Sequence, residues 1–207
     1  MPAAPTDETL MFSYRDGDMQ AFRELYNRHS QGLYLFIAWR SPRRDWVDEI
    51  VQDTWASLHQ ARARYQHQAA FRTYLFQIAR NKLIDQLRQN RRTVLASEWR
   101  NDVDNDADDD GIDRLLDASC DTPSPETMLE TTQQTQLLHA AIRTLPSEQR
   151  EALVLQQFNG MSLEEIAELV NAPVETVKSR LRYAMKKLRQ QFDQPRLPDV
   201  NLQGGKA

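Results

Sequence analysis

The segment NGMSLEEIAELVNAPVETVKSRL, residues 159–181, predicts two helices joined by a tight turn. Ser162 and Glu165 have the S-x-x-E spacing of a capping box, so we expect the first helix to begin there. Residues 171–172 interrupt it. Pro173 suits the first position of the second helix, because an N–H at that position would have no partner in the helix. This build is typical of a helix-turn-helix.

The second helix is expected to have one buried and one charged face. Its apolar residues follow at steps of three and four and predict a buried stripe of Val174, Val177, Leu181, Ala184 and Leu188. The remaining surface carries cations against the single acid Glu175: Lys178, Arg180, Arg182, Lys186, Lys187 and Arg189. A solvated amphipathic helix is the simpler alternative. The capped first helix, the proline and the cationic face together favour a helix that reads DNA.

Charge is divided unevenly along the chain. The formal net charge is -4 over 207 residues, but residues 97–126 hold eleven acidic and only two basic side chains. A second basic stretch, residues 62–92, holds eight Arg and Lys residues against Asp85 alone. We therefore predict two basic modules separated by an acidic connector.

Length and composition limit the class of protein. The length suits two small domains. No apolar run approaches the roughly 20 residues that span a bilayer, and the N-terminus lacks a signal-peptide core, so we expect no direct membrane insertion. Cys120 is the single cysteine, and the four histidines show no ligand spacing. We expect no disulfide, no metal site, no cofactor and a cytoplasmic location.

Helical spacing recurs throughout, and no alternating strand pattern is found. We expect an all-α fold with helices at residues 7–15, 18–40, from 45 onward, 71–92, 125–144 and 147–158, followed by the helix-turn-helix. In the second of these, one face collects Phe22, Leu25, Tyr26, His29, Leu33, Phe36 and Ile37. In the third, the inward face is Trp46, Ile50, Trp55 and Leu58.

Three blocks in this order resemble the extracytoplasmic-function (ECF) sigma factors of the sigma-70 family, the smallest bacterial promoter-recognition subunits of RNA polymerase. They are DEIVQDTW at residues 48–55, FRTYLFQIARN at residues 71–81 with its continuation to residue 92, and LPSEQR at residues 145–150 before the helix-turn-helix. The resemblance implies a core-binding and promoter-melting domain at residues 1–95 and a flexible acidic linker at 96–124. It further implies a helix-turn-helix domain at 125–192 and a disordered tail at 193–207. We expect the two domains to pack little against each other, because the linker is long, acidic and aperiodic.

The resemblance also assigns residues to the minus-ten element. Opening DNA requires cations for the backbone and a pocket for an unstacked base, and it requires no catalytic group, so we expect no enzymatic activity. The implied residues are Tyr65, Arg80, Asn81, Lys82, Asp85, Arg88, Arg91 and Arg92. Tyr65 borders the unstacked base in this interpretation. A loop aromatic covering the edge of the core is the alternative.

In the recognition helix, the positions that match the family's base readers are Lys178, Ser179 and Arg182. Cationic side chains suit the acceptors of guanine, and a serine hydroxyl suits either base. Phosphate contacts are expected nearby and hold the register without reading sequence. The whole implied set for the minus-thirty-five element is Thr176, Lys178, Ser179, Arg180, Arg182, Tyr183 and Lys186.

An acidic helix face repels DNA and therefore requires another explanation. The resemblance implies that Asp48, Glu49, Gln52 and Asp53 dock on core RNA polymerase through carboxylate–arginine pairs. A solvated face is the alternative. Core polymerase and promoter DNA are thus the implied partners, and an anti-sigma factor is a possible third. No residue pattern identifies that factor, the regulon or the inducing signal.

Two rival interpretations remain. Residues 106–117 superficially fit a calcium loop, but Asp117 stands where a bidentate Glu is expected, and a solvated connector is the simpler explanation. In the sigma-factor interpretation the connector instead follows the RNA path. For the whole chain, the alternatives are a stand-alone helix-turn-helix regulator and a protein–protein adaptor. Both leave part of the charge pattern without a role.

Overall fold

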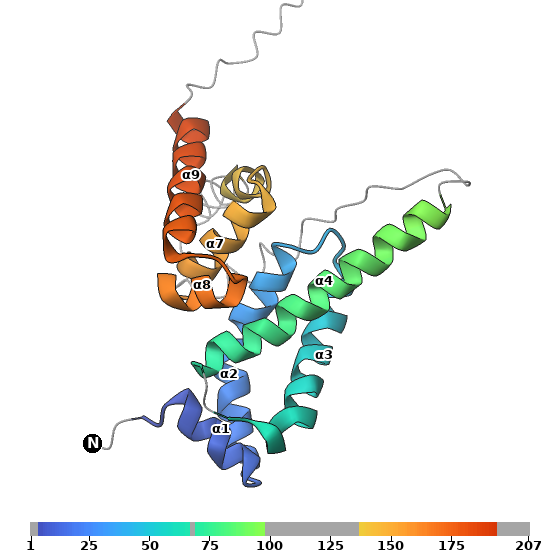
Figure 1. Ribbon diagram of the computed structural model, residues 1–207, viewed down its shortest axis with the longest axis vertical. Coiled ribbons are helices and arrows are strands. Elements are labelled where there is room, and N and C mark those ends of the chain that lie inside the picture. Colours follow the sequence, from blue (N-terminus) through green and yellow to red (C-terminus); the bar gives the residue numbers. More distant parts are fainter. Residues whose placement is uncertain (1–3, 67–68, 98–136, 194–207) are drawn as a thin grey trace, which may run out of the picture.

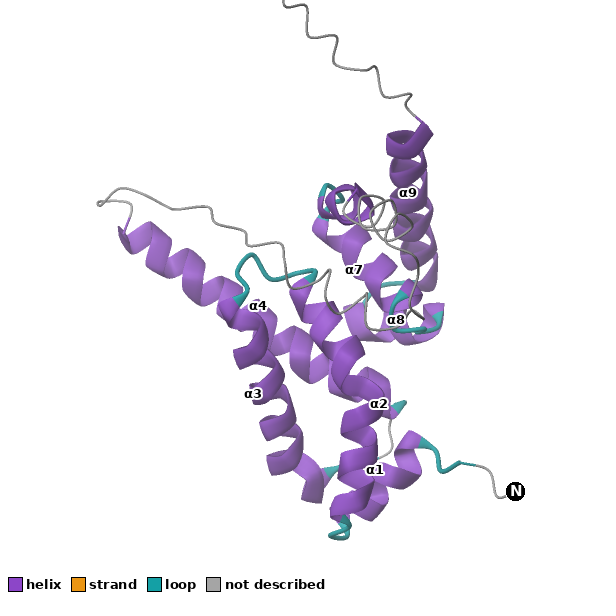
Figure 2. Cartoon of the chain, turned by 180° about the vertical axis from the view of Figure 1, so that it is seen from behind, coloured by secondary structure: helices purple, strands orange, loops and turns teal. Residues whose placement is uncertain are grey.

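The computed structural model describes residues 4–66, 69–97 and 137–193, and within these ranges it contains helices and no strand. The all-α prediction is confirmed (Figures 1 and 2). The elements are α1 (Asp7–Arg15), α2 (Met19–Ala38), α3 (Asp45–Ala61), η1 (Arg62–Arg64), α4 (Phe71–Ser97), α7 (Ser147–Gln157), α8 (Leu163–Val170) and α9 (Val174–Asp193). Residues 137–143 are also helical.

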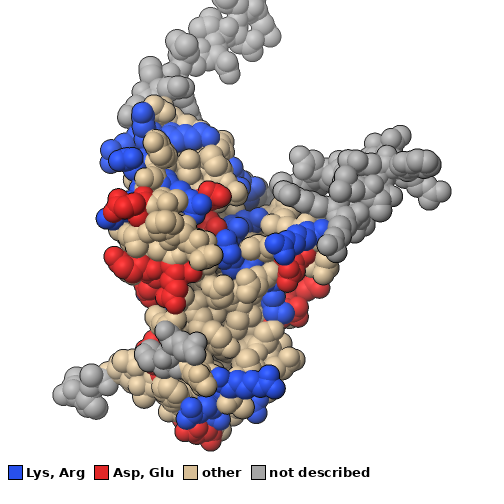
Figure 3. Space-filling view, viewed as in Figure 1, with Lys and Arg blue, Asp and Glu red and all other residues tan. Residues whose placement is uncertain are grey.

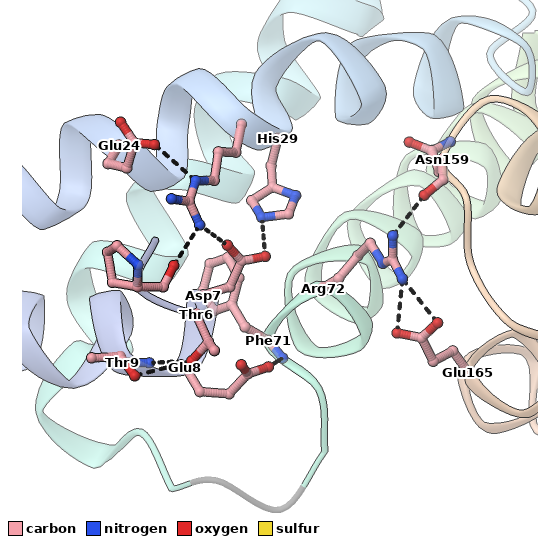
Figure 4. A network of polar contacts seen from close by, with 12 residues as sticks. Thr6, Asp7, Glu8, Thr9, Glu24, His29, Phe71, Arg72, Asn159 and Glu165 are labelled. Carbon is pink, nitrogen blue, oxygen red and sulfur yellow. Dashed lines mark hydrogen bonds and ion pairs between the residues drawn. The ribbon is translucent and has the colours of Figure 1, made fainter. Parts of the chain in front are cut away.

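Local capping explains where the N-terminal helices begin. The carboxylate of Asp18 accepts hydrogen bonds from the backbone N–H groups of Gln20 at 2.8 Å and Ala21 at 3.3 Å, which starts α2. Gly17 precedes it with φ +108, a conformation that side chains disfavour, so α1 and α2 meet at a sharp turn. The side chain of Glu8 in α1 accepts from the backbone N–H of Phe71 at 3.0 Å and so anchors the start of α4 (Figure 4).

In the N-terminal half, α1, α2, α3 and α4 pack around one core. The inward face predicted for α3 is buried, and the side chains at its centre meet α2 and α4. Tyr26 in α2 departs from the prediction because it is 43% exposed and only its ring contacts Trp55, with centroids 5.0 Å apart. The fourth helix also continues to Ser97, beyond the predicted end at residue 92.

The C-terminal half contains the predicted helix-turn-helix. The Ser162 hydroxyl accepts from the Glu165 N–H at 3.1 Å, and the Glu165 carboxylate accepts from the Ser162 N–H at 2.7 Å, which is the expected capping box. Asn171 ends α8 with a left-handed φ of 51. Pro173 lies one position before α9, where its carbonyl accepts from the Val177 N–H at 3.2 Å, so it is the N-cap rather than the first helical residue.

The two halves pack against each other, which corrects the expectation of little mutual contact. Figure 1 shows α8 beside the start of α4, and α7 contacts α2. Trp39, at the end of α2, is 2% exposed and meets His139 edge-on at a centroid distance of 5.0 Å. The prediction assumed that each half buries its apolar surface within itself. Trp39 instead packs against side chains of the other half.

Candidate nucleic-acid interface

The recognition helix α9 presents its cations to solvent because its apolar stripe is held against α7 and α8. Val177, Leu181, Ala184 and Leu188 are buried, and Val174 is partly buried, as predicted. Figure 3 shows basic side chains gathered over α9 at the top of the view. The exposed members of the predicted set are Lys178, Arg182, Tyr183 and Lys186, and the half-buried ones are Thr176, Ser179 and Arg180.

Neighbouring acids hold two of these cations. Lys178 donates to Glu175 at 2.6 Å, and this hydrogen bond raises the pKa of the Lys178 ammonium group. Arg180 donates to Glu148 of α7 at 2.6 Å. Arg182 lies over the ring of Tyr183, 5.5 Å from its centroid. An exposed guanidinium in the middle of an exposed helix suits contact with base edges.

Lys187 has a structural contact that the sequence did not predict. Its ammonium group donates to the backbone carbonyl of Thr144 at 2.6 Å, which ties α9 to the segment before α7. Solubility alone was the simpler explanation for this residue. The bond shows that Lys187 also holds the domain together.

On α4, the predicted minus-ten residues divide into two groups. Arg80 is half-buried and donates to Glu151 of α7 at 3.0 Å. Asn81 and Arg88 are exposed, and Lys82 lies 3.5 Å from Asp53 of α3. The remaining residues, Asp85, Arg91 and Arg92, follow on the same helix. Arg80 thus contacts the C-terminal half, whereas Asn81, Asp85 and Arg88 are exposed.

The ring of Tyr65 belongs to the aromatic core, which is the alternative that the sequence left open. It is 4% exposed and packs edge-on against Phe12 and Phe71, with centroids at 5.6 and 6.5 Å. Burial raises the pKa of its hydroxyl to about 12, so this group remains a proton donor at neutral pH. The hydroxyl has no hydrogen-bond partner within the described ranges.

Tyr65 also lines a pocket of about 330 Å³ beside α4. The lining residues are Arg64, Tyr65, Gln66, Ala69, Thr73, Tyr74, Gln77 and Glu168. Sequence reasoning did not identify Thr73 and Gln77 as pocket residues, although Thr73, Gln77 and Asn81 recur at steps of four. That spacing places three polar side chains along one face of a helix, and it was the available signal.

The acidic face of α3 lies where the sequence predicted it. Asp48, Glu49, Gln52 and Asp53 are exposed, while Ile50 and Trp55 are buried on the opposite side. Apart from the contact of Asp53 with Lys82, these carboxylates form no ion pair with another described residue. They form an accessible acidic surface suited to a basic protein partner.

No cluster of potential metal ligands occurs among the described residues. Residues 106–117 of the possible calcium loop, and Cys120, lie outside them. No described helix is both long enough and apolar enough to cross a bilayer.

Two family models match the chain. The model described as Sigma-70 region 2 matches residues 25–93, and the model described as Sigma-70, region 4 matches residues 135–188. The first covers α2, α3 and most of α4. The second covers the helix-turn-helix and the segment before it.

Curated relatives match over most of their length. The ECF RNA polymerase sigma-E factors of Escherichia coli and Salmonella typhimurium are each 27% identical over 177 residues, covering 85% of this chain and 88% of theirs. That of Haemophilus influenzae is 27% identical and is covered to 89%.

Solved structures show the same fold. The sigma factor RpoE in complex with the anti-sigma factor NepR from Bartonella quintana has a TM-score of 0.65 at 22% identity, covering 86% of this chain and 100% of that one. CnrH in complex with the cytosolic domain of CnrY has a TM-score of 0.60 at 24% identity, covering 90% and 97%. With both family models in sequence order and relatives matched nearly end to end, the chain belongs to the ECF sigma factors of the sigma-70 family.

Proposed function

We propose that this sigma factor binds core RNA polymerase through the acidic face of α3 and recognises promoter DNA through α4 and α9. In this assignment α9 reads the minus-thirty-five element, and α4 with its adjoining pocket binds the minus-ten element. The protein acts in the cytoplasm as a non-enzymatic subunit, because strand opening requires binding energy and no catalytic group.

The observation that supports this assignment most directly is the separation of charge by element. An exposed acidic face on α3 and exposed cations on α9 lie on different elements of one chain. A stand-alone helix-turn-helix regulator explains only the C-terminal half. Because the region 2 match covers residues 25–93, that alternative is not favoured.

Charge reversal on α3 tests the polymerase contact. Asp48→Lys together with Asp53→Lys should abolish association with core polymerase, because both carboxylates would be replaced by cations facing a basic partner. Both side chains are exposed, so the fold should be retained. Gel filtration with core enzyme measures association, and a circular dichroism melt measures folding.

The control makes a single charge reversal of the same kind elsewhere. Asp16→Lys alters an exposed carboxylate in the turn after α1 and should leave association unchanged. Normal association of the α3 double variant would show that this face is merely solvated. Transcription from a promoter library with purified core enzyme then tests the assignment of function as a whole.

A further inference from the structure

The start of α4 is capped by a side chain from another helix. Ala69 and Ala70 precede Phe71, and neither side chain carries a hydrogen-bond acceptor. The first N–H groups of a helix have no partner within the helix, so they require one from outside it. For the Phe71 N–H this partner is Glu8 of α1, 63 positions earlier, whose carboxylate accepts at 3.0 Å (Figure 4). Glu8 thus takes the place that an N-cap side chain usually has.

The position of Glu8 is fixed by contacts of α1. Desolvation disfavours the charged form of Glu8, but hydrogen bonds, first among them that from the Phe71 N–H, hold the pKa of the carboxyl below its usual value. The neighbouring Asp7 ties α1 to α2, because its two carboxylate oxygens bind Arg28 at 2.9 Å and His29 at 2.7 Å. The acceptor is therefore ionised at neutral pH and lies on a helix that is itself anchored.

α1 also supports the pocket beside α4 from behind. Tyr65, which lines that pocket, packs edge-on against Phe12 of α1, with ring centroids 5.6 Å apart. The charge of Glu8 acts on the same tyrosine, because it adds to burial in raising the pKa of the Tyr65 hydroxyl to about 12. Both the ring and the hydroxyl of Tyr65 are thus influenced by α1.

Two hydroxyl groups of the pocket lining lack a hydrogen-bond partner among the described residues. They belong to Tyr65, which is 4% exposed, and to Thr73, which is 3% exposed. A buried polar group without a partner is costly, and a ligand that completes its hydrogen bonds removes this cost. Thr73 lies in the first turn of α4, directly after the anchored Phe71 N–H. The placement of both hydroxyls therefore depends on contacts that α1 makes.

We propose that α1 is a positioning element for the base pocket: Glu8 caps α4 from outside and thereby holds Tyr65 and Thr73 where an unstacked base contacts them. The proposal rests on the proposed role of α4 and its pocket in binding the minus-ten element. α1 precedes residues 25–93, which match the region 2 model, and it contains none of the residues assigned to that element. Without the cap, base binding has to order the start of α4, which lowers the affinity for the preferred base.

Selection from a promoter library tests this role in the holoenzyme assembled with purified core polymerase. The library is double-stranded DNA randomised over the minus-ten and minus-thirty-five elements, and sequencing of the bound fraction gives the enrichment of each base at each position. Glu8→Ala should lower the enrichment of the preferred bases at the minus-ten element about three- to tenfold, as expected for the loss of one helix cap. Enrichment at the minus-thirty-five element should stay unchanged, because α9 reads that element from the other half of the chain.

Two smaller changes at Glu8 separate the hydrogen bond from the charge. Glu8→Gln keeps an oxygen at the same reach and should behave like the parent. Glu8→Asp keeps the charge but is one methylene shorter, so it should behave like Glu8→Ala. This pair carries the same test if Glu8→Ala fails to fold. Ala70→Ser, added to Glu8→Ala, supplies a local cap and should restore the minus-ten preference.

Asp18→Ala is the matched control, because it removes the side chain that caps α2. It should lower the stability by a similar amount without changing the base preference, and urea unfolding followed by circular dichroism measures the loss in each variant. Parent-like minus-ten enrichment in Glu8→Ala, an equal loss at both elements, or the same loss in Asp18→Ala would overturn the proposal. A parent-like Glu8→Asp together with a defective Glu8→Gln would also overturn it, because the charge and not the hydrogen bond would then matter.

The parent holoenzyme separates this proposal from the proposed function. If the parent shows no base preference at the minus-ten element, the proposed function of α4 fails, and the role of α1 fails with it. If the parent shows that preference and Glu8→Ala retains it, the proposed function stands and only the positioning role of α1 is wrong.

Discussion

Removal of the Glu151 carboxylate should destabilise the protein far more than removal of an exposed acid. The Glu151 side chain is 4% exposed and that of Arg40 is 11% exposed. Burial lowers the pKa of the Arg40 guanidinium, and the nearby carboxylate of Glu151 opposes this shift. Glu151→Ala would leave the guanidinium desolvated without its counter-charge. Breaking a buried pair from one side costs about 3–5 kcal/mol of unfolding free energy.

Loss of the Arg80–Glu151 pair contributes less to this loss of unfolding free energy than loss of the Arg40–Glu151 pair. Its side chain is 22% exposed, so water partly replaces the lost carboxylate. Replacing both Arg40 and Glu151 by Leu should recover much of the loss, because a buried ion pair and an apolar pair of similar volume are often comparable in stability. The cost of Glu151→Ala should therefore arise mainly from the unpaired Arg40.

Urea unfolding of the full chain, followed by circular dichroism, measures these differences. Glu148→Ala is the control. Glu148 likewise pairs with an arginine, in this case Arg180 of the same half, but the Glu148 side chain is 66% exposed. Its loss should stay below about 1 kcal/mol. If Glu151→Ala lost no more stability than Glu148→Ala, the buried pair would not hold the halves together.

Three further outcomes are expected. Lys178→Ala or Arg182→Ala should cost about 1–3 kcal/mol of binding free energy at the correct upstream element and relax its sequence preference. Lys186→Ala should instead weaken binding to all sequences. Unchanged discrimination in a promoter-binding assay would refute the base-reading role. Burial alone would raise the pKa of the Glu165 carboxyl, but the Ser162 N–H and the Arg72 guanidinium lower this pKa below 4.5. The carboxylate therefore stabilises the fold above pH 4.5, and this contribution is lost as the pH falls through the lower pKa of the folded state. Urea unfolding of the parent and of Glu165→Gln should give converging stabilities in acid, and a constant difference would contradict this. Neutralising six connector acids by serine should raise nonspecific DNA binding by the free protein in a gel-shift assay, and equal binding would refute the electrostatic role of Asp102, Asp104, Asp106, Asp108, Asp109 and Asp110.

Features encoded by short-range spacing were predictable from the sequence. The capping box between Ser162 and Glu165 and the buried stripe of α9 depend on residues three or four positions apart, so the pattern and the structure agree. The acidic face of α3 follows from the same logic, because its exposed polar residues recur four positions apart, on the side opposite the buried residues. Elsewhere the boundaries shifted, as at Pro173 and at the end of α4.

The contact between the halves was not predictable from spacing. Arg72 and Glu165 are separated by 93 positions, and each has a sufficient local explanation: a basic residue of α4 and the second partner of a capping box. Trp39 likewise fits the end of an amphipathic helix. Only the three-dimensional arrangement shows that these residues carry a second contact. The place of Tyr65 was not predictable for a different reason, because a loop aromatic is compatible with both a core and a binding role.

The position of each cation along α4 determines whether the contact between the halves leaves it accessible. Arg72 and Arg80 contact carboxylates of the C-terminal half, whereas Asn81, the next residue, and Arg88, about two turns later, are exposed. In this arrangement Asn81 and Arg88 are accessible to a DNA backbone, whereas Arg72 and Arg80 are paired with carboxylates. In the proposed assignment, long-range attraction depends on net charge and base binding depends on the pocket, so encounter and base recognition are separable steps on one helix.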